Sequence, residues 1–335
     1  MAPILIQVPD CIWSKALFDG TVKVDGFDVA FEHAPFDQRT SRRLRGELEE
    51  KYAGAEQVLT DYIVRVSRGV ENELIALPIF VTRGMVHRKL VMRHGAAPKG
   101  LKGRLVGMGR VLGATSVYLR GLLEDEHGIG RSDIRWLAAE PLTSDPAMGG
   151  EWKHLSERAG IKAAEMIAKL AADELAAVIY PGGAGGHWFN WLADRGASRT
   201  PDPYGDLEQM VAADANLSFP IGDPALQLQW FKKTKVYPTY HCLAIRKSVG
   251  AGSRGLAGAL VAAFDRAAKA APHYMSADER KLYEREQELL GVDPNACGLN
   301  DLNERTVEKC VDYLAADGLL LRWLTAQEIF PIETT

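Results

Sequence analysis

Three side chains that could do acid–base or anion-binding chemistry lie beside apolar runs of the sequence. His241 follows Pro238 and directly precedes the apolar run 242–245, while Arg83 and His87 lie between two further apolar runs. Proline disfavours a helix, and a short apolar run is typical of a strand that a parallel sheet buries on both faces. We therefore predict that all three side chains lie at strand ends, where they could face one cleft.

These residue types suit the handling of a small carboxylic acid. Histidine titrates near neutral pH, so His241 and His87 are candidate general acids. Arg83 is a candidate carboxylate ligand, because a guanidinium binds a carboxylate through two parallel hydrogen bonds. Tyr237 and Tyr240 could stack on an aromatic ring or hydrogen-bond to it. The alternative is that the histidines are hydrogen-bonded core residues and that the arginine is merely paired with an acid.

Two turns are candidate sites for a second anionic group. The pattern of 101–126 predicts strand, glycine turn and helix, with the Thr115 and Ser116 hydroxyls near a helix N-terminus whose free N–H groups bind anions. A glycine-rich loop that includes Gly186 precedes His187, and its small residues allow a ligand to approach the backbone closely. A capped helix without ligand and a flexible turn over an aromatic patch are the alternatives.

The sequence favours neither a cofactor nor a metal. Gly107, Gly109 and Gly113 resemble a dinucleotide fingerprint, but the final spacing is wrong. The loop before His187 lacks the Lys-Ser or Lys-Thr of a Walker motif. Neither the four cysteines nor the eight histidines show metal-ligand spacing.

Composition excludes several kinds of partner. Forty basic and 44 acidic residues give a net charge of −4, so no basic field is present to hold nucleic acid or an anionic membrane. No apolar run approaches the roughly 20 residues of a membrane helix. The N-terminal segment turns polar after eight residues, which is too short for a signal peptide. We expect a cytoplasmic protein with a small-molecule partner, and a homo-oligomer is left open.

Alternating strand and helix patterns predict an α/β fold with mostly parallel sheets and a helical C-terminal segment. Strands are expected at 4–8, 26–32, 74–81, 89–92, 133–138 and 177–180, and helices at 39–51, 56–68, 254–271, 276–290 and 302–316. Ser276 and Glu279 form a capping box. Two strand-rich blocks predict two lobes, one formed by 1–88 with 247–335 and the other by 89–246, with the ligand cleft between them.

Along nearly its whole length the sequence resembles the 4,5-dihydroxyphthalate decarboxylase family. The resemblance covers 22–29, 56–69, 78–92, 115–128, 170–181 and 237–246. Its most specific parts are Arg83 with His87, Thr115 with Arg120-Gly121 and Glu126-His-Gly128, and Pro238 with His241. The segments 107–113 and 182–191 depart from the family pattern. The resemblance implies the type II periplasmic-binding-protein fold and a cytoplasmic lyase.

It also implies loss of CO2 from a hydroxylated aromatic di-acid such as 4,5-dihydroxyphthalate. Such a reaction needs a proton donor for the ring carbon, a carboxylate clamp and a dry pocket, and no cofactor. His241 and His87 are the candidate donors and Arg83 the clamp. Two alternatives stay open: a non-catalytic binding protein for a similar acid, and another lyase of the same fold, because function depends on the site and not on the fold.

Overall fold

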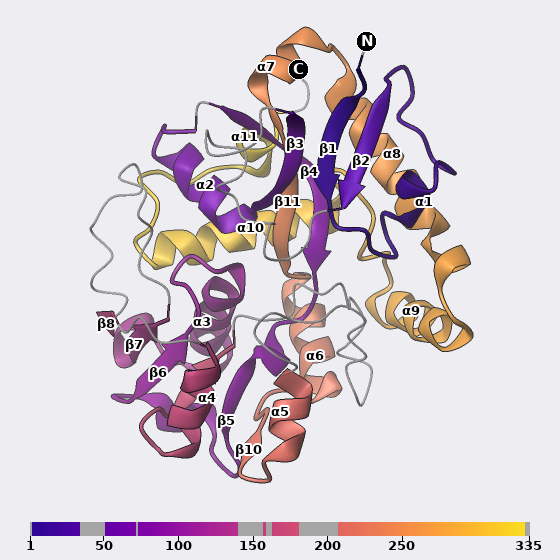
Figure 1. The fold of residues 1–335 in the computed structure, drawn as a ribbon. Helices are drawn as coiled ribbons and strands as arrows, with labels where there is room; N and C mark the ends of the chain where they lie inside the picture. The colour runs from indigo at the N-terminus through magenta and orange to yellow at the C-terminus, as the bar shows by residue number, and fades with distance from the viewer. Residues whose placement is uncertain are drawn as a thin grey trace. The chain divides into compact units, whose positions relative to one another are not determined.

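The structure is a computed structural model that describes residues 2–33, 51–71, 73–139, 157–158, 163–180 and 207–331. The chain divides into two compact units, and each contains one sheet (Figure 1). Unit 1 comprises Met1–Arg83, Lys235–Glu308 and Leu324–Thr335, and unit 2 comprises Gly84–Thr234 and Lys309–Trp323. Each unit is therefore built from segments that are distant in sequence.

The sheet of unit 1 has the strand order β2-β1-β3-β11-β4 (Figure 1). Its strands are β1 (Ile4–Val8), β2 (Val29–His33), β3 (Tyr52–Val58), β4 (Leu74–Arg83) and β11 (Thr239–Arg246). β1 pairs in parallel with β2 and β3, whereas β11 pairs antiparallel with β3 and β4. The strand that carries His241 thus lies between two strands from the first quarter of the chain.

Several helices belong wholly to unit 1. They are α1 (Lys15–Phe18), α2 (Leu59–Ser67), α7 (Lys247–Gly252), α8 (Leu256–Ala270), α9 (Ala277–Leu290) and α11 (Ala326–Ile329). On α8, Leu256, Leu260 and Phe264 recur at helical spacing and join one core cluster with Ile6 and Leu243 of the sheet. This packing holds β1 and β11 rigidly in the sheet.

The sheet of unit 2 has the order β10-β5-β9-β6-β7-β8 among its described strands. Its strands are β5 (Leu90–Arg93), β6 (Leu105–Met108), β7 (Arg135–Ala138), β8 (Glu157–Arg158), β9 (Ala177–Ile179) and β10 (Leu217–Ser218). The helices are α3 (Ala114–His127), α4 (Ala163–Ala171), α5 (Leu207–Ala213) and α6 (Pro224–Thr234). Met166 and Leu170 of α4 pack with Val91 and Val178 in the core.

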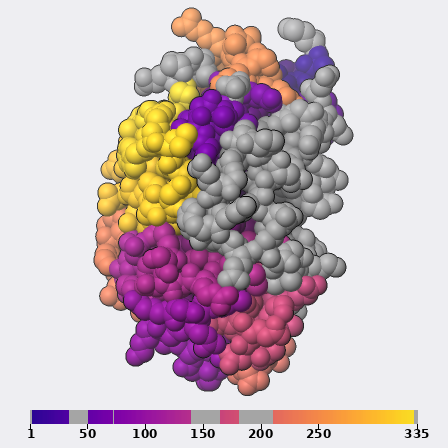
Figure 2. Space-filling model, turned by 90° about the vertical axis from the view of Figure 1, so that its left-hand side faces the viewer, coloured from indigo at the N-terminus to yellow at the C-terminus, as the bar shows by residue number. Residues whose placement is uncertain are grey.

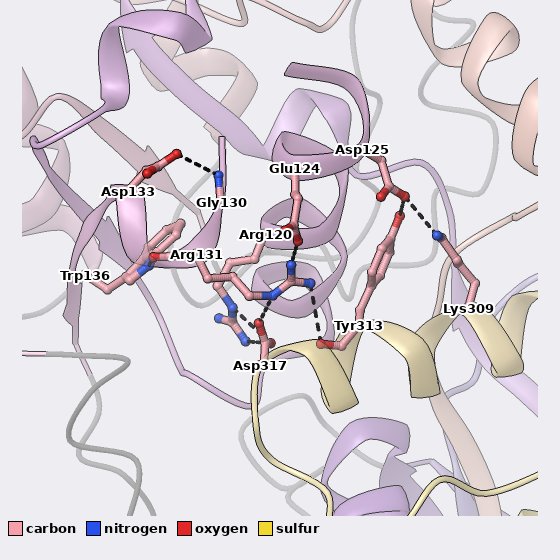
Figure 3. A network of polar contacts seen from close by, with 10 residues as sticks. All are labelled: Arg120, Glu124, Asp125, Gly130, Arg131, Asp133, Trp136, Lys309, Tyr313 and Asp317. Carbon is pink, nitrogen blue, oxygen red and sulfur yellow. Dashed lines mark hydrogen bonds and ion pairs between the residues drawn. The ribbon is translucent and has the colours of Figure 1, made fainter. Parts of the chain in front are cut away.

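Helix α10 (Asp301–Ala316) contributes to both units, since the division falls after Glu308. At its C-terminal end Asp317 accepts hydrogen bonds from Arg120 and Arg131 within unit 2 (Figure 3). Arg120 Nη2 lies 2.5 Å from Asp317 Oδ2, and both side chains are fully buried. Nearby, Tyr313 donates to Asp125 at 2.8 Å. The network fixes the end of α10 on α3, because removing one partner of a buried ion pair is costly.

The C-terminal segment is coloured yellow in Figure 2 and contributes a broad area of surface in that view. Two of its apolar side chains, Leu321 and Trp323, are exposed. Isolated exposed apolar side chains of this kind are ordinary on a protein surface.

The predicted α/β class is confirmed, and most of the predicted elements that lie in the described residues are present. Among the described strands, five of the nine pairings are parallel and four are antiparallel. The Ser276 capping box is confirmed at the start of α9. The helix expected at 39–51 lies almost entirely outside the described residues. Among the described residues, no helix is long and apolar enough to cross a membrane.

Three details differ from the sequence-based expectations. The run 242–245 is buried, but β11 is antiparallel to both neighbours and not part of a parallel set. The divisions between the units fall after Arg83 and Thr234, so β11 belongs to unit 1, and residues 309–323 belong to unit 2 although all of 247–335 was expected in the first lobe. The start of the helix expected at 56–68 is the end of β3, and α2 begins only at Leu59.

Candidate functional site

His241 lies in β11 of unit 1 and is bonded to a buried carboxylate. Its Nδ1 atom is 2.5 Å from Oε1 of Glu56 in β3. Thr82 of β4 donates a second hydrogen bond to the same oxygen at 2.8 Å. The Glu56 side chain is only 2% exposed, whereas that of His241 is 17% exposed. Three adjacent strands therefore hold a histidine that is oriented by a carboxylate and is still partly exposed.

Arg83 ends β4 in the same unit and directly follows Thr82. The register pairs Thr239 with Arg83 and His241 with Thr82, and the register shifts between the two pairs. Such bulges re-aim side chains and occur often beside active sites. The Arg83 side chain donates to Oδ1 of Asn303 at 2.7 Å and is 97% buried as a residue. The structure therefore places a guanidinium and an imidazole on neighbouring strands of one sheet.

The guanidinium of Arg83 also lies over an aromatic ring. Its central carbon is 4.9 Å from the centroid of Phe80, three residues earlier in β4. Cation–π contact and the Asn303 amide together fix the direction of the guanidinium. Asn303 is itself held, because its amide donates to the carbonyl groups of Ala296 and Gly298. An arginine fixed in this way loses little entropy when it binds an anion.

The two tyrosines predicted to contact a ring are buried in unit 1. Tyr237 donates its hydroxyl to Oε1 of Glu286 at 2.6 Å, and its backbone N–H donates to Thr306. Burial raises the pKa of both tyrosines, and for Tyr237 the Glu286 carboxylate adds to the effect. Both hydroxyls therefore stay protonated at neutral pH. Tyr237 is held in the fold by these hydrogen bonds. We therefore expect it to stabilise the structure around the site and not to contact the substrate directly.

His87 lies in unit 2, in the short 3-10 helix His87–Lys89. It is buried against Trp230 of α6, with the ring centroids 5.4 Å apart. Burial, with a smaller contribution from His127, lowers the pKa of His87 from 6.5 to about 3. His87 is therefore neutral at physiological pH and has no imidazolium proton to give.

Thr115 and Ser116 occupy the first turn of α3 in unit 2, as the strand–turn–helix pattern predicted. Gly113 is the N-cap and offers no side chain for capping, so the first N–H groups of α3 receive no hydrogen bond from a cap side chain. Ser116 is buried and Thr115 is half-buried. Gly186 and His187 lie outside the described residues.

A small cavity of about 30 Å³ opens in unit 1 beside Phe80. Trp13, Cys11 and Cys297 also line it. Burial raises the pKa of Cys297 to about 12, so this thiol stays protonated. The volume suffices for about two water molecules, while an apolar cavity that takes up benzene measures about 150 Å³. The cavity is thus too small for an aromatic ring.

Arg83, His241 and the two tyrosines belong to unit 1, whereas His87, Thr115 and Ser116 belong to unit 2. Sequence reasoning missed Glu56, Thr82 and Asn303. Glu56 carried one usable signal, since an isolated acid among apolar residues of a strand is rarely buried without a partner. Among the described residues, no three His, Cys, Asp or Glu side chains cluster as metal ligands would.

Comparison with known proteins identifies relatives of this chain. No family model matches it. It is 26% identical over 264 residues to 4,5-dihydroxyphthalate decarboxylase of Comamonas testosteroni, covering 75% of this chain and 70% of the relative. It is 28% identical over 135 residues to the protein of the same name from Pseudomonas putida, covering 39% and 51% of the two chains. These relatives confirm the resemblance that the sequence motifs indicated.

Solved structures that match the chain show its fold. A periplasmic sulfonate-binding protein of Methylobacillus flagellatus aligns with a TM-score of 0.53 at 12% identity, covering 98% of this chain and 91% of that one. A protein of Archaeoglobus fulgidus aligns with a TM-score of 0.51 at 13% identity, covering 95% and 98%. The chain therefore has the type II periplasmic-binding-protein fold and is related in sequence to curated 4,5-dihydroxyphthalate decarboxylases.

Proposed function

We propose that the protein is a carboxy-lyase that releases CO2 from a hydroxylated aromatic di-acid such as 4,5-dihydroxyphthalate. The observation that carries the proposal is the pairing of His241 with buried Glu56, on strands next to the one that ends in the fixed guanidinium of Arg83. The names of the two curated relatives support the reaction class and the substrate class. Proton donor and carboxylate ligand then come from neighbouring strands of one rigid sheet.

The reaction needs one proton and no net oxidation or reduction. His241 gives a proton to the ring carbon that bears the departing carboxylate, and a C–H bond forms. The C–C bond to that carboxylate then breaks, its electron pair restores the aromatic ring, and CO2 leaves. A ring hydroxyl stabilises the protonated ring by donating electron density. Water returns a proton to His241 after each turnover.

Arg83 is the proposed ligand of the carboxylate that stays on the ring. A guanidinium held by Asn303 and the Phe80 ring is already oriented, so binding costs little further ordering. His241 is preferred to His87 as the acid, because a histidine whose pKa is about 3 is neutral at pH 7. The hydroxyl groups of Thr115 and Ser116 are proposed to bind the second anionic group of the di-acid.

The direct test is CO2 release from purified, chelator-treated protein supplied with 4,5-dihydroxyphthalate and hydroxylated benzoates. The His241→Asn variant is expected to lose at least about 100-fold in kcat, the lower range of general acid catalysis, while the acid still raises its melting temperature. His273→Asn, at an exposed histidine of the same unit, serves as the matched control.

One outcome would favour the alternative function. The same fold occurs in sulfonate-binding proteins, so a non-catalytic receptor for an aromatic acid is the competing hypothesis. Stabilisation of the unmodified protein by the acid without any CO2 release would contradict the lyase and support the receptor.

A further inference from the structure

We propose that Glu56 is a positioning residue that sets the tautomer of His241. Its carboxylate keeps the proton on Nδ1, so that Nε2 is the nitrogen that exchanges a proton with the substrate. The inference rests on the proposed function for the substrate step alone. The tautomer itself is a property of the protein without ligand.

The sheet register brings the two side chains together. β3 and β11 run antiparallel, with Leu243 opposite Glu56 and His241 opposite Val58. Side chains two residues apart on a strand share one face, so Glu56 and His241 are diagonal neighbours on the same face of the sheet. A long carboxylate side chain can reach across this diagonal, and the Nδ1–Oε1 distance of 2.5 Å shows that it does.

The donor inventory then fixes the position of the proton. An ionised carboxylate can only accept hydrogen bonds, and Oε1 of Glu56 already accepts one from Thr82. The ring nitrogen that faces it, Nδ1 of His241, must therefore donate. A buried carboxylate without donors is costly, so Glu56 selects the Nδ1-protonated form of the imidazole. In the neutral ring, Nε2 is left as the acceptor, and in the imidazolium it becomes the donor.

Charge strengthens the effect. The Glu56 side chain is 2% exposed, so its negative charge is poorly screened where it faces the ring. The ring itself keeps 17% of its surface accessible, so a substrate or water can approach it. A histidine proton donor requires a partner that orients its ring and a surface that the substrate can reach. Glu56 provides the first, and the exposed part of the ring provides the second.

A purely structural role for Glu56 is the competing explanation, because the same bonds tie β3, β4 and β11 together. Nitrogen-15 NMR of side-chain-labelled histidine separates the two roles. We expect the neutral His241 ring to be protonated at Nδ1 in the unmodified protein and to shift toward Nε2 protonation in Glu56→Leu. Thr82→Val removes the second bond to the same oxygen without touching the ring, and it should keep the Nδ1-protonated form.

Kinetics supply the second readout. Glu56→Gln keeps an acceptor at this position but removes the charge, and it is expected to lower kcat about 100-fold while KM changes little. In a His241→Asn background the same substitution should have no further effect on the residual rate, because Glu56 acts only through the ring.

Each result decides the proposal. An Nε2-protonated ring in the unmodified protein, or an unchanged tautomer in Glu56→Leu, would overturn it, as would independent, multiplying effects of the two substitutions on kcat. If Glu56→Leu does not fold, the Glu56→Gln kinetics and the tautomer of the unmodified protein still decide. If the unmodified protein releases no CO2, the proposed function fails, while the NMR result still decides the pairing.

Discussion

At the scale of single residues, the two histidines predicted as proton donors lie in opposite environments. His241 is partly exposed and bonded to a carboxylate, whereas His87 is buried against Trp230 and has a pKa of about 3. Sequence places both beside apolar runs, and neither the depth of burial nor the facing charge is visible there. The difference between a partly exposed histidine bonded to a carboxylate and a buried one therefore comes only from the structure, and the role of each as proton donor stays a prediction.

The pKa of His87 makes stability depend on pH in a defined direction. Above pH 6.5 neither the folded nor the unfolded chain protonates this side chain. Below pH 6.5 the unfolded chain binds a proton that the folded state refuses until about pH 3, so stability is lost as the pH falls, by about 1.4 kcal/mol per unit. Between pH 7.5 and pH 5 the loss from this group is about 2 kcal/mol.

We expect His87→Leu to remove this part of the acid sensitivity. Urea unfolding at pH 7.5 and pH 5 should show a loss of stability smaller by about 2 kcal/mol in the variant than in the unmodified protein. His273→Leu, at an exposed histidine, should keep the original difference. Parallel stability curves for the unmodified protein and His87→Leu would show that His87 does not titrate as the structure indicates.

At the scale of elements, part of the most specific sequence resemblance is explained by packing. Arg120 forms the buried ion pair with Asp317 (Figure 3). Its neighbour Gly121 in α3 lies against Tyr313 of α10 in unit 2. A Cβ atom on Gly121 would lie 2.2 Å from ring carbons of Tyr313. The ring cannot move freely, because it is buried and its hydroxyl is bonded to Asp125. This arginine and glycine are therefore needed for the fold of unit 2.

Replacing Gly121 by alanine is expected to destabilise the protein by about 1–3 kcal/mol, because an inserted methyl group forces the Tyr313 ring from its place. Gly258→Ala is the matched control, since Gly258 lies in α8 with open space around its Cβ position. That substitution should stabilise by up to about 1 kcal/mol. Thermal unfolding measures the change in melting temperature of each variant. Changes of the same sign would contradict the close approach of Gly121 to the Tyr313 ring.

The sequence predicts elements well where periodicity is strong and poorly where it changes. The strand 4–8 and the capping box at Ser276 are confirmed. The segment 56–68 was predicted as one helix, because Val58, Tyr62 and Val66 are near helical spacing, yet β3 extends to Val58. Because Glu56 was assigned to that helix, its contact with His241 across two paired strands could not be predicted. Strand direction was also missed for β11, because a buried run has the same composition in parallel and antiparallel sheets.

At the scale of the whole molecule, the chain passes between the two units four times. Two of these passages carry a residue with unusual backbone torsion angles. Gly84 has a φ of 149°, and Lys235 has a φ of 57°, in the left-handed region that few residues other than glycine adopt. Residues of this kind at chain crossings are suited to absorb the backbone changes of a hinge. A third passage lies inside the continuous helix α10.

The ligand cleft between two lobes stays a prediction, and small-angle scattering can test it. If the acid contacts both units, binding should favour a closed arrangement and lower the radius of gyration of the protein in solution. Arg83→Ala should weaken the binding of any acid, so at a concentration that saturates the unmodified protein its radius should change little. Thermal shift, recorded on the same samples, reports binding independently of shape. An acid that stabilises the unmodified protein fully without changing its radius would be bound within one unit, and the hinge at Gly84 and Lys235 would then have no part in binding.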